Sequence, residues 1–209
     1  MLTQKIKTLQ TKQQAIVTSL SLLLVLLMVS PALADNGNAR SQCISAAAQA
    51  GMSIPDLNNV NVIVGTEGDD LFVGQATEGP DVFCGLGGQD YLETLDEGDV
   101  FLGGVGNDSV SFLKGGTFYG GKGFDSVGNL EGGTFNGDKG NDSVEYLYGG
   151  TFNGGAGDDD SVTFQYGGTF NGGAGDDVVS VLEGGTFNGD KGFDRVGFLY
   201  GGTFNPGPQ

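Results

Sequence analysis

Aspartates that close glycine-rich turns recur along most of this 209-residue chain. The turn has the form Gly-(Gly or Asp)-x-Gly-x-Asp, and its complete examples end at Asp108, Asp125, Asp142, Asp159, Asp177 and Asp194. Looser forms end at Asp70, Asp81 and Asp90. Carboxylates and backbone carbonyls are the oxygen ligands that Ca²⁺ prefers, and the ion accepts about six to eight of them in flexible geometry. The turns therefore predict calcium sites.

Stacked turns would place one carboxylate per turn in a column. Carboxylates about 5 Å apart repel by roughly 1 kcal/mol in water, and several-fold more near a low-dielectric surface. Lys122, Lys139 and Lys191 supply only part of the counter-charge that such a column needs. The chain has no histidine and only two cysteines, so the side chains that bind zinc, copper or iron are scarce. We therefore expect a hard divalent cation between adjacent turns, and calcium suits such a site better than magnesium, which demands a strict octahedron.

Repeats of about 17 residues must position these turns. Gly-Gly-Thr-Phe occurs six times, at spacings of 17, 17, 18, 17 and 17 residues, and the longer spacing comes from an extra aspartate in the segment 158–160. Valine and phenylalanine recur at fixed positions of the repeat, each within a short stretch where apolar and polar residues alternate. Alternation predicts strands with one face inward, and the glycine clusters predict tight turns. A column of leucines, which Gln165 interrupts, is expected near one turn.

Each repeat can bury its apolar face only against the next repeat, which predicts a solenoid. We expect an all-β fold, a right-handed parallel β-roll or β-solenoid with coils of about 17 residues and a short N-terminal capping helix. The expected segments are a signal peptide over residues 1–34, an N-terminal cap over 35–64, calcium-binding repeats over 65–205 and a C-terminal tail over 206–209.

The repeated pattern Gly-Gly-x-Gly-x-Asp-x-(apolar)-x, over about residues 65–196, resembles the nonapeptide of the RTX (hemolysin-type) calcium-binding repeat family. The resemblance implies a parallel β-roll with several Ca²⁺ ions held between the turns of successive coils, and with the aspartate at the sixth position as a ligand. The aspartates that it marks are Asp70, Asp81, Asp90, Asp108, Asp125, Asp142, Asp160, Asp177 and Asp194, with Asp159 as the alternative to Asp160 in the 18-residue coil. The turn glycines that it marks are Gly103, Gly106, Gly120, Gly123, Gly137, Gly140, Gly154, Gly157, Gly172, Gly175, Gly189 and Gly192.

The chain departs from that family in two respects. Its coils alternate one calcium-type nonapeptide with an eight-residue half that ends in Gly-Gly-Thr-Phe, whereas the usual coil of the family has two nonapeptides. We therefore expect one calcium column along one edge and a metal-free turn at the opposite edge. The family commonly uses a C-terminal secretion signal, but this chain has an N-terminal one, and its 209 residues hold no toxin, protease or lipase module. A toxin function is therefore not carried over.

The first 34 residues have the composition of a secretory signal peptide. Lys5, Lys7 and Lys12 precede an apolar run over 20–29, and a small-x-small ending leads to Ala34. These features predict export with cleavage after Ala34. A membrane anchor is the alternative, but the apolar run is shorter than the roughly 20 residues that span a bilayer. We expect a secreted, extracellular protein that meets a membrane only through its signal peptide.

Two cysteines remain in the predicted mature chain. Cys43 lies in an alanine-rich stretch, 38–52, that predicts a short helix, and Cys84 lies in the first glycine-rich turns. In an exported protein this pair predicts one disulfide, which would fasten the helix onto the first turn of the repeat. Two free or intermolecular thiols are the alternative.

The charge of the chain limits its partners. The formal net charge is −17, and all 26 acidic residues follow residue 34. Nucleic acids and anionic membrane surfaces would be repelled, whereas cations would be attracted. The absence of histidine removes the usual serine and cysteine triads, so we do not expect an enzyme.

Two functions agree with these features. The first is a calcium-folded structural or interaction module of the cell exterior, whose partners are calcium ions and a cell-surface component or further copies of itself. The second is recognition of ice or another regular surface by outward ladders. The threonine ladder is Thr117, Thr134, Thr151, Thr169, Thr186 and Thr203. The asparagine ladder is Asn136, Asn153, Asn171, Asn188 and Asn205, and Tyr119 breaks the series. Both ladders also have a plainer interpretation, in which threonine favours strands and asparagine stacks at a turn by hydrogen bonding.

Overall fold

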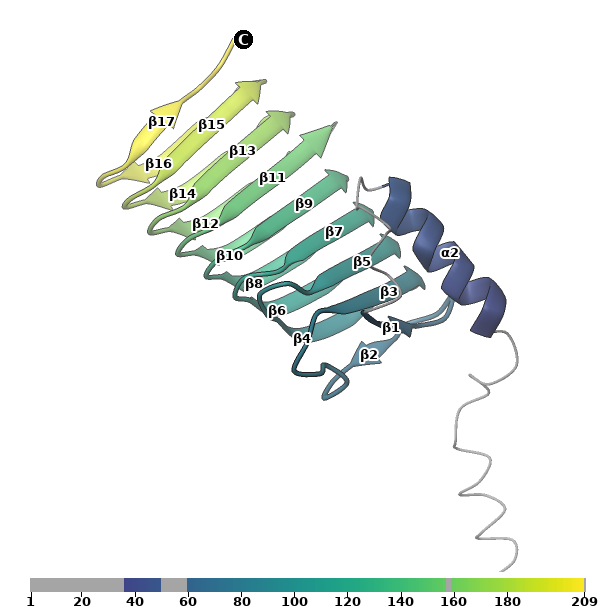
Figure 1. Ribbon diagram of the computed structural model, residues 1–209. Coiled ribbons are helices and arrows are strands. Elements are labelled where there is room, and N and C mark those ends of the chain that lie inside the picture. Colours follow the sequence, from purple (N-terminus) through teal and green to yellow (C-terminus); the bar gives the residue numbers. More distant parts are fainter. Residues whose placement is uncertain (1–35, 50–59, 157–158, 209) are drawn as a thin grey trace, which may run out of the picture. The chain divides into compact units, whose positions relative to one another are not determined.

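The computed structural model describes residues 36–49, 60–156 and 159–208. The predicted signal peptide and its cleavage site therefore lie outside the described residues. From Gly37 onward the chain forms one compact unit. Across the described ranges it contains a helix, α2 (Asn36–Gln49), and two parallel sheets (Figure 1). No helix among these residues is long and apolar enough to cross a membrane.

The two sheets form the opposite walls of a solenoid, and the chain alternates between them. Sheet A consists of β1 (Asn61–Val64), β3 (Asp81–Gly87), β5 (Val100–Val105), β7 (Thr117–Lys122), β9 (Thr134–Lys139), β11 (Thr151–Ala156), β13 (Thr169–Ala174), β15 (Thr186–Lys191) and β17 (Thr203–Asn205). Sheet B consists of β2 (Leu71–Phe72), β4 (Tyr91–Leu95), β6 (Ser109–Leu113), β8 (Ser126–Leu130), β10 (Ser143–Leu147), β12 (Ser161–Gln165), β14 (Val178–Leu182) and β16 (Arg195–Leu199).

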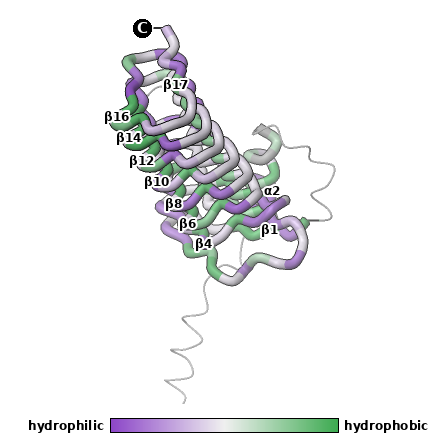
Figure 2. Tube along the Cα trace, turned by 90° about the vertical axis from the view of Figure 1, so that its left-hand side faces the viewer, coloured by the Kyte–Doolittle hydropathy of each residue, from purple (hydrophilic) through white to green (hydrophobic). Residues whose placement is uncertain are grey.

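Every strand pairs in parallel with the strand one coil away, and equivalent residues of the repeat face one another. Thr134 pairs with Thr151, and Val144 pairs with Val162, for example. The same hydrophobic and hydrophilic segments consequently recur from coil to coil along the stack (Figure 2). The predicted all-β parallel solenoid with coils of about 17 residues and a short N-terminal helix is confirmed.

Stacked columns of identical side chains fill the core. The phenylalanines of sheet A stack face to face from Phe101 to Phe204, with ring centroids 4.7–5.0 Å apart. Valines and leucines of sheet B complete the core, and nearly all of these side chains are fully buried. Because each coil buries its apolar side chains mainly against its neighbours, the stack as a whole provides the stability that one coil lacks.

Gln165 is the polar exception in the leucine column. It pairs with Leu147 on one side and Leu182 on the other, and it is fully buried. Its Nε2 donates a hydrogen bond to the Thr186 carbonyl at 2.9 Å. Its Oε1 is buried and accepts no hydrogen bond from the described residues. A buried acceptor without a donor destabilises the folded state.

Helix α2 packs on the outer face of sheet A at the first coils. The disulfide Cys43–Cys84 joins it to β3, with the two Cα atoms 5.8 Å apart, so the predicted pairing is confirmed. Around this bond Val82, Leu102 and other outward side chains of β1, β3, β5 and β7 form a second apolar cluster. Tyr119 belongs to this cluster, which explains why it stands where later coils have asparagine.

Replacing Gln165 by leucine should stabilise the protein. The substitution extends the leucine column and removes the Oε1 atom without a donor, so we expect the free energy of unfolding to rise by about 1–2 kcal/mol. Thermal unfolding followed by circular dichroism measures the change. The matched control is Leu147→Gln, which places a second amide in the same column and should lower the melting temperature. A Gln165→Leu protein that melts below the wild type would contradict this account of the column.

Candidate functional site: a buried aspartate column

The column lies at the edge where the chain leaves sheet A and enters sheet B. In each coil one aspartate directly precedes a strand of sheet B, and the parallel register of these strands brings the aspartates into line. The members of this aspartate column are Asp70, Asp90, Asp108, Asp125, Asp142, Asp160, Asp177 and Asp194. The six inner members are at most 2 % exposed. The stacked carboxylates that the sequence predicts are therefore present, and they lie inside the coil.

A repeated hydrogen bond joins each member to the next. The backbone N–H of one aspartate donates to Oδ1 of the aspartate one coil later, at 2.7–2.9 Å in all seven steps. The aspartate carbonyl accepts from the first residue of the next strand of sheet B, as Asp108 does from Ser126 N at 2.9 Å. Through these hydrogen bonds, the aspartate column connects each turn to the next coil.

The second carboxylate oxygen has a different environment. Oδ2 of Asp90, Asp108, Asp125, Asp177 and Asp194 is buried and accepts no hydrogen bond from the described residues. A buried carboxylate oxygen without a donor or a cation is costly, because burial disfavours the charged form.

The first glycine of each turn makes room for this oxygen. A Cβ atom at Gly120 would overlap Oδ2 of Asp125, and a Cβ at Gly103 would overlap Oδ2 of Asp108. A Cβ at Gly103 would also lie only 2.8 Å from the carbonyl oxygen of Gly120 in the next coil. A carboxylate oxygen and a backbone carbonyl oxygen therefore approach the same point beside the glycine Cα.

Burial raises the pKa of the inner carboxyl groups. The pKa rises from 3.8 to about 7 for Asp90, about 6 for Asp108, about 8 for Asp125 and about 6 for Asp177. Desolvation is the main cause in every case, and the N–H bond to Oδ1 opposes it. Neighbouring carboxylates raise the pKa of Asp125 further. In the absence of a cation, these four carboxyl groups therefore titrate between about pH 6 and pH 8.

The structure resolves the ambiguity between Asp159 and Asp160. Asp160 occupies the aspartate column, whereas Asp159 lies in a second row, one residue earlier in the turn. In that row a side-chain oxygen accepts a backbone N–H of the next coil: Phe124 N–H donates to Asn107 Oδ1, and Asp176 N–H donates to Asp159 Oδ1, both at 2.9 Å. The sequence analysis did not identify this row, although the frequent Asn or Asp at the fifth turn position is a visible signal.

Asp81 does not join the aspartate column, and the grouping made from the sequence is corrected here. Asp81 is the first residue of β3 in sheet A, so it lies at the opposite edge of the solenoid. Its backbone N–H donates to Oδ1 of Asp99, one coil later, at 2.9 Å. Asp99 was not predicted, although it follows Asp81 by 18 residues. Both Asp99 oxygens accept backbone N–H groups, from Asp81 and from Asp96 at 3.3 Å, so this pair is satisfied internally.

The oxygen set of the aspartate column fits a hard cation. Within the ranges that the structure describes, no three His, Cys, Asp or Glu side chains converge on one point. Each coil contributes a single carboxylate, and a cation would need backbone carbonyls of the turns for its other ligands. Of the predicted turn glycines, Gly157 lies outside the described residues.

The outward ladders of sheet A do not favour ice or surface recognition. Asparagine amides hydrogen-bond along the stack, with Asn153 donating to Asn136 at 2.9 Å and Asn171 donating to Asn153 at 2.8 Å. The same bond links Asn188 to Asn171 and Asn205 to Asn188. Each of these four amides thus uses an N–H group within the protein, which supports the structural interpretation of the ladder.

Without metal, the solenoid should be more stable in acid than at neutral pH. A carboxyl group whose pKa is raised on folding stabilises the protein fully below its unfolded value, here 3.8, and loses that effect as the pH rises through the folded value. For this column the loss therefore begins above about pH 4 and is complete near pH 6 for Asp108 and near pH 8 for Asp125. Each pKa unit corresponds to about 1.4 kcal/mol, so the melting temperature in chelator should fall clearly from pH 4.5 to pH 8.

Asp125→Asn is the matched variant for this measurement, because an amide imitates the neutral acid. Its melting temperature in chelator should depend less on pH than that of the wild type. A wild-type melting temperature that rises steadily from pH 4.5 to pH 8 would show that the column is not protonated in the metal-free fold.

No protein-family model matches the chain, and neither a curated protein nor a solved structure is similar enough to count as a match. The geometry of the aspartate column therefore carries the functional argument.

Proposed function

We propose that this chain is an exported calcium-binding repeat module, a structural or interaction component of the cell exterior, without catalytic activity. Ca²⁺ would bind between successive glycine-aspartate turns and stabilise the solenoid. The observation that carries this proposal is the row of buried Oδ2 atoms that accept no hydrogen bond in the described residues. Such a row requires positive charge or protons.

A cation suits the column better than protons do at neutral pH. Protonation would satisfy each carboxyl group only below its raised pKa, which is about 8 for Asp125 and about 7 for Asp90 but only about 6 for Asp108 and Asp177, so protons alone do not satisfy the whole column at neutral pH. The residues that would hold calcium are the carboxylates of the aspartate column and the carbonyls of the neighbouring turn glycines, such as Gly103 and Gly120. When bound, the ion supplies charge neutralisation, which removes the repulsion between adjacent carboxylates.

The coils themselves suggest why a cation would be needed. Of the 209 residues, 41 are glycines, which lose more conformational entropy on folding than other residues. The core is only two sheets thick and relies on one phenylalanine, one valine and one leucine column. Calcium outside cells reaches concentrations that saturate weak sites, so binding after export would contribute directly to folding.

Calcium, but not magnesium, should stabilise the protein at pH 7.5. We expect the melting temperature to rise with calcium concentration, and the pH dependence to reverse relative to chelator, because the ion favours the ionised column. Far-UV circular dichroism during calcium and magnesium titrations of residues 35–209 measures both effects. A β signal and melting temperature that are identical in chelator and calcium would contradict the proposal.

Two conservative variants distinguish the loss of a calcium ligand from a general loss of stability. Asp125→Asn removes one charge from the aspartate column and should weaken calcium binding at adjacent sites by about tenfold or more, which corresponds to about 1.4 kcal/mol. Asp99→Asn is the control, because Asp99 is also buried and bonded to backbone N–H groups but lies at the opposite edge. Equal loss of calcium affinity in both variants, measured by calorimetry, would assign the effect to general destabilisation.

Export makes a separate prediction. The basic start, apolar run and small-residue ending over residues 1–34 should direct the chain out of the cytoplasm, with cleavage after Ala34. N-terminal sequencing of the protein released from expressing bacteria should begin at Asp35. A chain that stays in the cytoplasm with Met1 retained would contradict this part of the proposal.

A further inference from the structure

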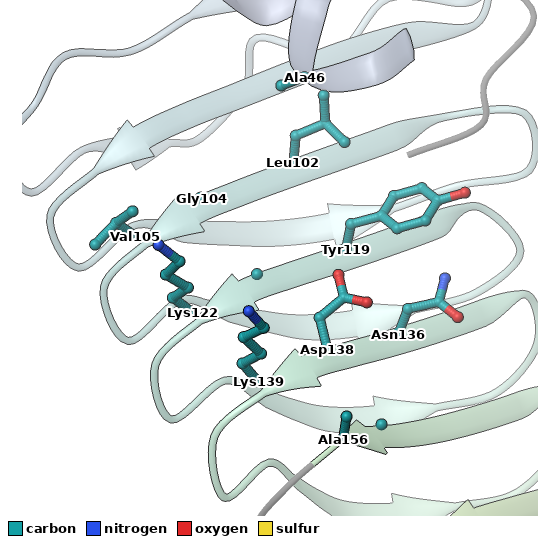
Figure 3. Close-up of a pocket in the computed structure, with 12 residues that line it drawn as sticks. Ala46, Leu102, Gly104, Val105, Tyr119, Lys122, Asn136, Asp138, Lys139 and Ala156 are labelled. Atoms are coloured by element: carbon teal, nitrogen blue, oxygen red, sulfur yellow. The ribbon is translucent and has the colours of Figure 1, made fainter. Parts of the chain in front are cut away.

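A groove of about 790 Å³ runs over the outer face of sheet A beside helix α2. Ala46 of the helix forms part of one wall, and Leu102 and Tyr119 lie next to it (Figure 3). The groove extends across β5, β7, β9 and β11. The disulfide Cys43–Cys84 fixes α2 to this sheet, so the wall belongs to the folded protein.

The floor of the groove is formed by one column of residues on the outer face of sheet A, and most of its members in the groove are glycines without side chains. This column contains Gly104, Gly121 and Gly155, and it holds a single side chain among them, that of Asp138. Asp138 has a φ of 73°, in the left-handed region that the glycines of this column also use. This backbone conformation is unfavourable for a non-glycine residue, so placing the Asp138 carboxyl group in the groove costs conformational free energy.

Two lysines stand side by side at one end of the groove. Lys122 and Lys139 are register partners on β7 and β9, so their backbones are one strand spacing apart, about 4.8 Å. Figure 3 shows both side chains extending in the same direction from the ends of their strands. Neither forms an ion pair with any residue in the part of the chain that the structure describes. On a chain of net charge −17, this pair is a local concentration of positive charge, although Lys139 also interacts electrostatically with Asp138.

The other end of the groove offers different chemistry. Tyr119 and Asn136 lie three residues before Lys122 and Lys139 on the same strands, which places them about 10 Å away along the strand. The tyrosine provides an aromatic ring and a hydroxyl, Asn136 provides an amide, and Asp138 provides an acceptor between the two ends. The groove therefore combines an anion site, hydrogen-bonding groups and an aromatic surface over a length greater than one sugar ring.

We propose that this groove binds an acidic saccharide, a uronate-containing segment of an extracellular polysaccharide. A sugar carboxylate lies between Lys122 and Lys139, ring hydroxyls bond to Asp138 and Asn136, and an apolar ring face contacts Tyr119. Asp138 and the overall acidic charge disfavour densely charged polyanions such as nucleic acids, whereas a saccharide spreads its carboxylates among many hydroxyls. The site is independent of the aspartate column, which lies inside the coil.

The last repeated turn supplies matched controls. Asp190 and Lys191 occupy in β15 the positions of Asp138 and Lys139, with the same left-handed aspartate, but they do not line the groove. The test measures binding of tetragalacturonate and of its methyl ester by calorimetry, at one fixed free calcium concentration that keeps the protein folded. Circular dichroism of each variant confirms that its solenoid is intact.

The wild type should bind tetragalacturonate, and the methyl ester should bind at least about tenfold more weakly, because it lacks the carboxylates. The double variant Lys122→Ala, Lys139→Ala should lose about tenfold or more in affinity, and Asp138→Gly should lose several-fold. Lys191→Ala and Asp190→Gly should bind as the wild type does. Binding that resists high salt and is insensitive to the lysine pair would overturn the proposal, as would no binding at all or an equal loss in the Lys191→Ala control.

Discussion

The bond from each aspartate N–H to the carboxylate of the next coil is the interaction on which the rest of this solenoid depends. It occurs where sheet A gives way to sheet B, so no strand partner is available to that N–H. Supplying the acceptor from a side chain satisfies the backbone, but it also brings a carboxyl group into the core. The first turn glycine, the raised pKa values and the demand for a counter-charge all follow from that one placement.

The two edges of the solenoid solve the same problem differently. At the opposite edge Asp81 and Asp99 form a short version of the ladder in which both Asp99 oxygens accept N–H groups. From Gly116 onward glycine replaces aspartate there, so the carboxylate is absent, while the backbone carbonyl still accepts the N–H of the next strand, as Gly116 O does from Thr134 N. The buried carboxylate column therefore runs along one edge alone, and the opposite edge has only the Asp81–Asp99 pair at its first coils.

The outer face of sheet A is divided in the same way along its length. The first coils carry valine, cysteine, leucine and tyrosine, which α2 covers. Later coils carry threonine and asparagine, whose amides bond to one another along the stack. The groove lies at the boundary between these regions. There α2 no longer covers the sheet, and the glycine column leaves the strand backbones without side chains. The proposed saccharide site at this boundary is lined by residues of both the helix and the repeats.

The sequence by itself determined the repeat length, the two strands per coil, the inward valine, leucine and phenylalanine columns and the disulfide. The repeat and its columns follow from local periodicity, because in a parallel stack equivalent residues must face one another. The disulfide follows instead from the presence of only two cysteines in a chain predicted to be exported. Only the tertiary structure decided which aspartates share a column. Asp81 and Asp90 both follow glycine-rich segments, but Asp81 begins a strand of sheet A whereas Asp90 directly precedes a strand of sheet B. Asp160 rather than Asp159 directly precedes β12. The groove was also invisible in the sequence, since it depends on where α2 packs and on which side of the sheet each glycine faces.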